Sequence, residues 1–118
     1  MRLEIQTEAS SPKQVIADLD GMAGKAKEAS DFLKALAHEG RLMILCILCD
    51  GEKSVTEIER KLSLRQPTVS QQLARLRMDG LVSTRRDGKT IHYRLANQDV
   101  RTIIGAVHDV FCRMRADA

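Results

Sequence analysis

Residues 54–76 of the 118-residue chain read SVTEIERKLSLRQPTVSQQLARL and carry its clearest structural signals. Ser54 and Glu57 have the spacing of a capping box, which predicts that a short helix begins there. After a four-residue turn, Pro67 suits the first turn of a second helix because it has no N–H to leave unsatisfied. Two short helices joined in this way indicate a helix–turn–helix. Their apolar residues recur at helical spacing and are expected to be buried: Val55, Ile58, Leu62, Val69, Leu73 and Leu76.

A two-stranded hairpin is predicted directly after these helices, beyond a helix stop at Gly80. Its strands, Leu81–Arg86 and Lys89–Leu95, flank Asp87-Gly88, which is a strong signal for a tight turn. A hairpin in this place is typical of the wing of a winged helix–turn–helix. Asn97 then caps a last helix, whose apolar residues repeat as in a helix-pairing seam: Val100, Ile104, Val107, Phe111 and Met114.

Three more helices are expected upstream. The first spans Gln14–Ala29, and the second is capped by Ser30 or Asp31 and is broken or bent at Gly40. The third ends at Asp50-Gly51 and buries a stripe made of Leu42, Leu45, Cys46 and Cys49. We therefore expect a flexible tail over residues 1–12 and one domain over residues 13–118. The domain is mostly helical with a β-hairpin wing, in the order α-α-α-α-α-β-β-α.

The net charge of +3 is unevenly distributed. Residues 60–95 hold nine lysines and arginines but only two acidic residues, Asp79 and Asp87. A concentrated basic surface points to a polyanionic partner such as nucleic acid. Aromatic residues make up only 3% of the chain, which excludes a stacking surface for single-stranded nucleic acid.

Double-stranded DNA is therefore the expected partner. The second helix of the pair suits the major groove, where Gln side chains bond adenine and Arg side chains hold phosphates. The basic hairpin tip suits the DNA backbone or the minor groove. The candidate DNA-binding residues are Arg65, Gln66, Thr68, Ser70, Gln71 and Arg75 on the helix and Arg85, Arg86 and Lys89 on the hairpin.

The three cysteines, Cys46, Cys49 and Cys112, are expected to be thiols. The longest apolar run, Leu42–Cys49, is far shorter than the ~20 residues that span a bilayer. Met1–Pro12 lacks the apolar core of a signal peptide, so we expect a cytoplasmic protein. Structural disulfides are rare in that compartment, and an odd number of cysteines argues against a simple disulfide framework. No cofactor is expected.

Several of these stretches, taken in order, resemble the ArsR family of winged-helix repressors. They are residues 36–45 (LAHEGRLMIL), 64–73 (LRQPTVSQQL), 80–82 (GLV) and 85–89 (RRDGK), so that the resemblance covers roughly residues 30–115. It implies a homodimeric repressor that binds operator DNA and dimerises through its first and last helices. Two positions depart from the family pattern. Glu39 stands where Pro is frequent, and Arg65 stands where a Ser cap is common, which bears on how the recognition helix begins.

The chain is also similar to the sulfide- and persulfide-responsive branch of that family, the BigR/SqrR-like proteins. The similarity lies in residues 41–46, 65–73 and 90–93 and in the pair Phe111-Cys112. It implies that Cys46 and Cys112 form a redox-sensing pair. Reaction with a persulfide or polysulfide bridges the two thiols through a disulfide or a longer sulfur chain and releases the DNA. Cys49 has no counterpart in that branch and is expected to be a buried, inert thiol.

Three alternatives remain open. A metal-responsive repressor can use Cys46, Cys49, Cys112 and His108, a ligand set that suits zinc. A small thiol enzyme fits less well, because its C-x-x-C motif belongs at a helix N-terminus and here lies late in a helix. A pure dimerisation module leaves the basic hairpin unexplained. The ligand spacings of the family's arsenic-type and zinc-type sites are missing from residues 55–62 and from the last helix, respectively.

Overall fold

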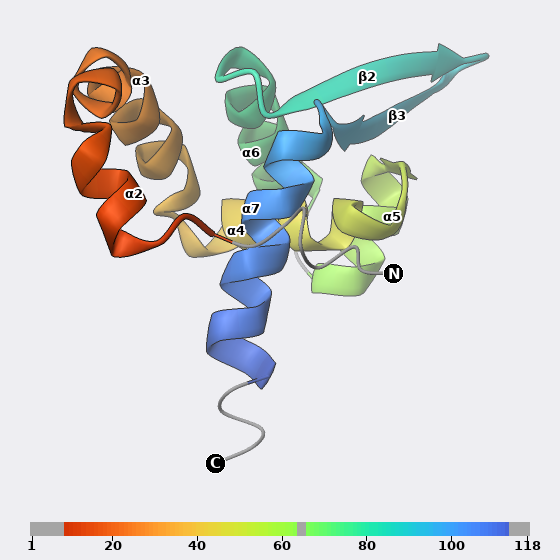
Figure 1. Cartoon of the computed structure of the whole chain (residues 1–118). Coiled ribbons are helices and arrows are strands. Elements are labelled where there is room, and N and C mark those ends of the chain that lie inside the picture. Colours follow the sequence, from red (N-terminus) through yellow and green to blue (C-terminus); the bar gives the residue numbers. More distant parts are fainter. Residues whose placement is uncertain (1–8, 64–65, 114–118) are drawn as a thin grey trace. The chain divides into compact units, whose positions relative to one another are not determined.

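The computed structural model describes residues 9–63 and 66–113, which form helices and one small sheet (Figure 1). Contacts divide the chain into two units, one ending at Lys34 and the other beginning at Ala35. The elements are α2 (Pro12–Ala17), α3 (Leu19–Leu36), α4 (Glu39–Ile47), the 3-10 helix η1 (Leu48–Asp50), β1 (Lys53–Ser54), α5 (Val55–Leu62), α6 (Gln66–Met78), β2 (Val82–Asp87), β3 (Thr90–Leu95), α7 (Gln98–His108) and the π-helical turn η2 (Asp109–Arg113).

The helix boundaries in the first unit differ from the sequence prediction. A capping box starts α2, in which Ser11 and Gln14 bond each other's backbone N–H groups. The chain then leaves helical geometry at Asp18, so the expected helix over Gln14–Ala29 is divided. The predicted cap at Ser30 or Asp31 is wrong, because α3 runs through both. The Asp31 carboxylate accepts a hydrogen bond from Lys27 Nζ at 3.0 Å, one turn back, and is not used as a cap.

The break predicted at Gly40 lies instead at Ala37–His38. Helix α3 ends at Leu36, and Gly40 belongs to the first turn of α4. His38 has extended backbone and acts as the N-cap of α4. Its Nδ1 atom accepts hydrogen bonds from the backbone N–H groups of Gly40 at 3.1 Å and Arg41 at 3.4 Å. An imidazole thus does what Ser, Asp or Asn usually does at a helix start.

Helices α5 and α6 form the expected helix–turn–helix. At the start of α5, Ser54 N–H donates to Glu57 Oε1 at 2.8 Å, and Glu57 N–H donates to Ser54 Oγ at 3.3 Å. At the end of α6, Gly80 has a φ of +77° and Leu81 N–H donates to the Leu76 carbonyl at 2.9 Å. This is a Schellman ending, in which glycine adopts the left-handed conformation without a steric cost. Helix α4 contacts both α5 and α6, so these three helices pack together.

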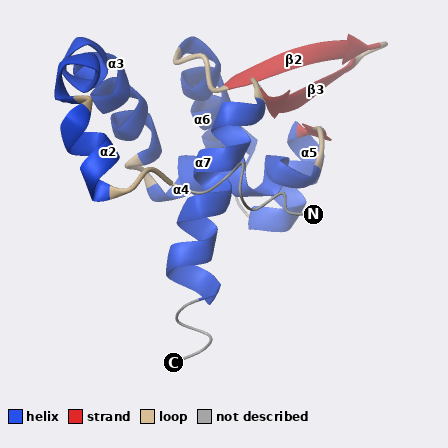
Figure 2. Ribbon diagram, in the orientation of Figure 1, coloured by secondary structure: helices blue, strands red, loops and turns tan. Residues whose placement is uncertain are grey.

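The predicted hairpin belongs to a three-stranded antiparallel sheet in the order β1-β3-β2 (Figure 2). Strand β1 was not predicted, since two residues are too few to show a period of two. The turn is shifted by one residue, because Asp87 pairs with Thr90 and leaves Gly88 and Lys89 as the loop. Of the two loop residues, only Gly88 has a positive φ, which is typical of a type II′ turn. This turn requires glycine at its first loop position.

The core of the second unit lies among α4, α5, α6, α7 and the base of the wing. The stripe expected on α4 is rotated: Ile44, Leu45 and Leu48 are 0% exposed, whereas Leu42, Cys46 and Cys49 are half-buried. Of the core residues predicted for the helix–turn–helix, Ile58, Val69, Leu73 and Leu76 are fully buried, whereas Val55 and Leu62 are half-buried. Their side chains, together with that α4 stripe, hold the helix–turn–helix on the rest of the unit.

The seam predicted on the last helix is only partly free for pairing with another helix. Val100 and Ile104 are 4% and 1% exposed, so they pack within their own chain. Val107 is half-buried and Phe111 is 61% exposed, while Met114 lies outside the described residues. The same helix therefore serves the core at its start and presents apolar surface at its end. In the described part of the chain, no helix combines the length and apolarity needed to cross a membrane.

We predict that Ser54→Ala lowers the free energy of unfolding by about 1 kcal/mol, because it removes the side chain that caps α5. Ser30→Ala is the matched control. It deletes the same hydroxyl group from the middle of α3, where alanine is the better helix former, and is expected to be neutral or slightly stabilising. Urea unfolding followed by circular dichroism at equal protein concentration measures both. Equal losses for the two variants would contradict the assignment of the caps.

Candidate DNA interface and thiol pair

Helix α6 buries one face and exposes another. Thr68, Ser70, Gln71 and Arg75 are all exposed, opposite the buried leucines and valine of the same helix. Arg75 Nε donates to Asp79 Oδ2 at 3.1 Å, so its guanidinium lies along its own helix. Arg65 and the side chain of Gln66 lie outside the described part of the structure. The exposed face of α6 is therefore polar and available to contact the groove of a ligand.

The wing presents its charge at its tip. Arg86 and Lys89 are exposed beside the Gly88 turn, and no ion pair involves either of them among the described residues. Arg85, by contrast, is paired with Glu52, a residue of the loop before β1: Arg85 Nε donates to Glu52 Oε1 at 3.0 Å, and its Nη2 also contacts this carboxylate. The guanidinium holds the pKa of Glu52 below its usual range. The sequence prediction missed Glu52, which neutralises one of the three basic residues assigned to the wing.

An arginine connects α4 to the recognition helix. Arg41 Nε donates to the Ala35 carbonyl at 2.8 Å, and Arg41 Nη1 donates to Gln72 Oε1 at 3.1 Å. The Gln72 amide nitrogen also lies 3.4 Å from Nε2 of the His38 cap. Gln72 follows the exposed Gln71 on α6, but it is half-buried, and its side chain is hydrogen-bonded within the protein. Helix α4 also carries Cys46. The same helix therefore holds this cysteine and contacts α6, the second helix of the helix–turn–helix.

Cys112 acts electrostatically on Cys46 although 66 positions separate the two cysteines in the chain. Cys46 is half-buried in the last turn of α4, and Cys112 is exposed in η2. Burial raises the pKa of Cys46, and repulsion from the Cys49 and Cys112 thiolates raises it further. At neutral pH the thiolate fraction of Cys46 is therefore lower than that of an unburied cysteine.

Cys46 is reachable from solvent. It lines an open pocket of about 410 Å³ together with Ile47, Cys49, Asp50 and Lys61. Burial raises the pKa of the Cys49 thiol, and the Arg101 guanidinium opposes that shift. Arg101 reaches across from α7, and its Nε donates to the Cys49 carbonyl at 3.0 Å. The expectation that Cys49 is buried is wrong, because the packed stripe of α4 faces another way and leaves this thiol half-buried.

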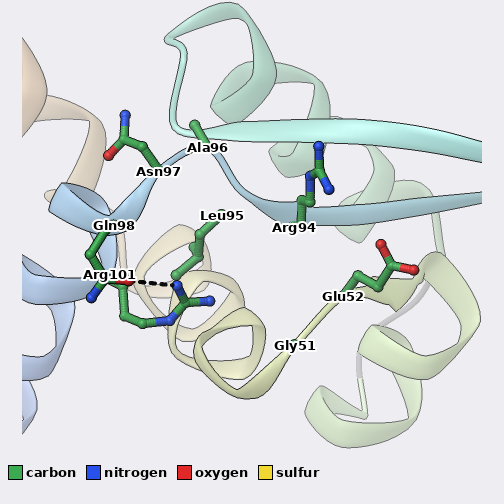
Figure 3. Close-up of a pocket in the computed structure, with 8 residues that line it drawn as sticks. All are labelled: Gly51, Glu52, Arg94, Leu95, Ala96, Asn97, Gln98 and Arg101. Atoms are coloured by element: carbon green, nitrogen blue, oxygen red, sulfur yellow. Dashed lines mark hydrogen bonds between the residues drawn. The ribbon is translucent and has the colours of Figure 1, made fainter.

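A second pocket lies between the loop before β1, the end of β3 and the start of α7 (Figure 3). Its polar groups are already in use: Arg101 donates to Gln98 Oε1 at 3.2 Å, Arg94 donates to Ser83 Oγ at 3.2 Å, and Glu52 pairs with Arg85. Asn97 caps α7 here, as the sequence predicts, by accepting from Val100 N–H at 3.0 Å. We therefore regard this pocket as a structural junction between the wing and α7.

The residues proposed for the alternative zinc site do not form a metal-binding cluster. In the described ranges, no group of three or more His, Cys, Asp or Glu side chains is arranged to hold a metal ion. All four proposed ligands, Cys46, Cys49, Cys112 and His108, fall within those ranges. His108 Nδ1 instead lies 3.3 Å from Asp109 Oδ1. The zinc hypothesis thus has no support in this geometry.

Comparison with known proteins gives one consistent result. Residues 38–84 match the model of the arsR family of bacterial regulatory proteins. A biofilm growth-associated repressor of Agrobacterium fabrum is 50% identical over 94 residues, which cover 80% of each chain. The crystal structure of the transcriptional repressor BigR from Xylella fastidiosa superposes with a TM-score of 0.75 at 43% identity, covering 79% of this chain and 95% of that one.

A homodimeric winged helix–turn–helix DNA-binding domain from Mycobacterium bovis is also similar, with a TM-score of 0.68 at 31% identity, covering 86% of this chain and 87% of that one. Its fold, like that of BigR, is the one described above: a helix–turn–helix followed directly by a hairpin. The relatives named here are described as repressors or as a DNA-binding domain. The predicted fold class and family are thus confirmed, and the chain belongs to the ArsR family of winged helix–turn–helix transcriptional regulators.

Proposed function

We propose that this protein is a dithiol-switched transcriptional repressor. It binds operator DNA as a homodimer when Cys46 and Cys112 are reduced. Bridging of these two thiols, on reaction with persulfide or polysulfide, releases the DNA. The observation that carries the proposal is the position of Cys46. It lines an open pocket on α4, the helix that contacts α6, and the charge of Cys112 in η2 contributes to the raised pKa of its thiol. Relatives described as repressors support the DNA-binding part.

The DNA contacts follow from the exposed surfaces. We assign α6 to the major groove, with Gln71 bonding a base edge and Thr68 and Ser70 contacting bases or phosphates. Arg86 and Lys89 on the wing tip are assigned to phosphates or the minor groove. Arg65, Gln66, Arg75 and Arg85 remain candidates, and Arg85 must share its charge with Glu52. Two such units bind two half-sites, and the exposed apolar residues Ile103, Val110 and Phe111 are the surface we assign to the partner subunit.

The two thiols are oxidised to a bridge in two steps. The Cys46 thiolate attacks the outer sulfur of a low-molecular-weight persulfide, which gives a Cys46 persulfide and releases the donor's thiol. The Cys112 thiolate then attacks Cys46 Sγ, forms the disulfide and displaces hydrosulfide. Attack on a longer sulfur chain gives a polysulfide bridge instead. The protein dithiol loses two electrons, and the sulfur donor gains them.

The bridge reaches the recognition helix through contacts that are already present. It ties η2 to α4, and α4 holds α6 through the Arg41–Gln72 hydrogen bond and the buried core. A change in the angle between α7 and α4 therefore changes the placement of α6 relative to the dimer axis. Because the two half-sites have a fixed spacing, such a change lowers operator affinity.

We predict different effects on DNA binding for the wing and for α6. Arg86→Ala weakens binding to all sequences and reduces the slope of log affinity against log salt by about 1, because one phosphate contact is lost. Gln71→Ala costs about 1–3 kcal/mol on the operator and little on non-specific DNA, because a base contact is lost. Fluorescence anisotropy from low to high salt measures both. Identical behaviour of the two variants would contradict these assignments.

We predict that Cys46→Ser and Cys112→Ser each abolish operator release by glutathione persulfide and leave affinity for DNA without the donor unchanged. Cys49→Ser is the matched control, since it removes a neighbouring thiol and retains the response. Gel shifts with and without donor, together with mass spectrometry of the adducts, measure the outcome. Release that survives the loss of both Cys46 and Cys112 would rule out this switch. Parallel arms with peroxide and zinc test other inducers.

We predict an alkaline pH profile for Cys46. Its pKa is raised chiefly by burial, so at neutral pH its thiolate fraction is lower than that of an unburied cysteine and rises with pH. The variant Cys49→Ser/Cys112→Ser, which keeps only Cys46, is alkylated with iodoacetamide across pH 6–10. Its rate should reach half-maximum at a higher pH than the same variant unfolded in urea. A lower midpoint in the folded protein would contradict burial as the cause.

A further inference from the structure

We infer that Cys49 is a second resolving thiol, which forms a local bridge with Cys46 in competition with Cys112. Its reactant is the persulfide of Cys46, formed by a low-molecular-weight persulfide donor. The inference rests on the proposed function, because it requires Cys46 to be the first thiol modified. It gives a chemical role to a cysteine that the sequence comparison with the persulfide-responsive branch left without one.

The backbone places Cys46 and Cys49 three residues apart at the end of α4, where a small local change would allow a disulfide. Residues three apart on a helix are neighbours, with Cβ atoms about 5–6 Å apart, whereas a disulfide needs about 3.5–4.5 Å. Between these two cysteines α4 gives way to the tighter 3-10 helix η1, which begins at Leu48. Side chains at i and i+3 eclipse each other in a 3-10 helix, so the change brings Cys49 closer to alignment with Cys46. Only a small further tightening closes the bridge.

Both thiols are open to the same reactant. Cys46 and Cys49 are half-buried and line one pocket, whose other residues are Ile47, Asp50 and Lys61. The ammonium group of Lys61 favours the entry of an anionic sulfur donor. The Arg101 guanidinium favours the Cys49 thiolate and counteracts part of the effect of burial on its pKa. Once Cys46 carries the outer sulfur, Cys49 faces it from within the same pocket.

The local bridge leaves the last helix free. The Cys49 thiolate attacks Cys46 Sγ, the new Sγ–Sγ bond forms, and hydrosulfide leaves, so two thiols and one persulfide give one disulfide, one thiol and hydrogen sulfide. Arg101 binds Cys49 through the main-chain carbonyl, which the sulfur chemistry does not consume. No covalent link to η2 results. The local bridge therefore holds Cys46 in a form that stays bound to DNA and lowers the fraction of protein that the donor can release.

The test uses Cys112→Ser, in which only the local bridge can form. After treatment with glutathione persulfide and alkylation of the remaining thiols, trypsin releases residues 42–53 with both cysteines in one peptide. We expect this peptide to have lost two hydrogens and to carry no alkyl group, while operator binding is retained. The control is Cys49→Ser/Cys112→Ser, in which Cys46 keeps its persulfide or forms a mixed disulfide with the donor. Circular dichroism checks that each variant is folded.

The outcomes separate this inference from the proposed function. If Cys112→Ser is modified at Cys46 while Cys49 is recovered alkylated, the local bridge is wrong and the switch stands. If the protein with the Cys46–Cys49 disulfide releases DNA, the inference that the local bridge leaves DNA binding intact is wrong. If Cys46 is never modified in any variant, the switch and the local bridge fail together. In Cys49→Ser the maximal release is expected to rise by about twofold over wild type, as for two resolving thiols of equal rate.

Discussion

Ile44, Leu45 and Leu48 are fully buried, and their packing determines which face of α4 each neighbouring helix contacts. These side chains fix the rotation of α4 about its axis, because turning them outward would cost roughly 1.5–3 kcal/mol for each one exposed. With this face turned inward, Arg41 is directed at α6, and Cys46 and Cys49 come to the edge of the helix. The same packing therefore supports the recognition helix and leaves two thiols at the edge of an open pocket.

The sequence could predict the elements whose signals are local. The capping box at Ser54, the Schellman glycine at Gly80 and the Asn97 cap each depend on residues a few positions apart, and each is found as expected. The rotation of α4 could not be predicted in this way. Residues 42–49 are all apolar, and a run without polar residues shows no preferred face. Only the partners on α5, α6 and α7 decide which three of the eight are buried.

The site was harder to predict than the fold, because several of its side chains form hydrogen bonds or ion pairs with residues far away in the chain. Arg85 was predicted to be available to DNA, yet its partner Glu52 lies 33 positions away in the chain; likewise, Gln72 is bound by Arg41, which lies 31 positions away. The break before α4 was misplaced for a different reason. Histidine is not a usual N-cap, so Gly40, two residues later, was the stronger signal for the end of the preceding helix. Charge counted along the sequence therefore overstates the free charge of the wing.

Helix α7 is fixed at one end and free at the other, which suits it to transmit a covalent change at its tip. Val100 and Ile104 anchor its start in the core, and Arg101 binds it to the end of η1. Its end leaves α-helical geometry at Asp109, and the wider π turn changes the direction in which Cys112 points relative to a continued α-helix. Phe111 beside it is exposed. A bond from Cys112 to α4 would thus act on the part of the helix that the core does not hold, and so would move the dimer surface before it disturbed the fold.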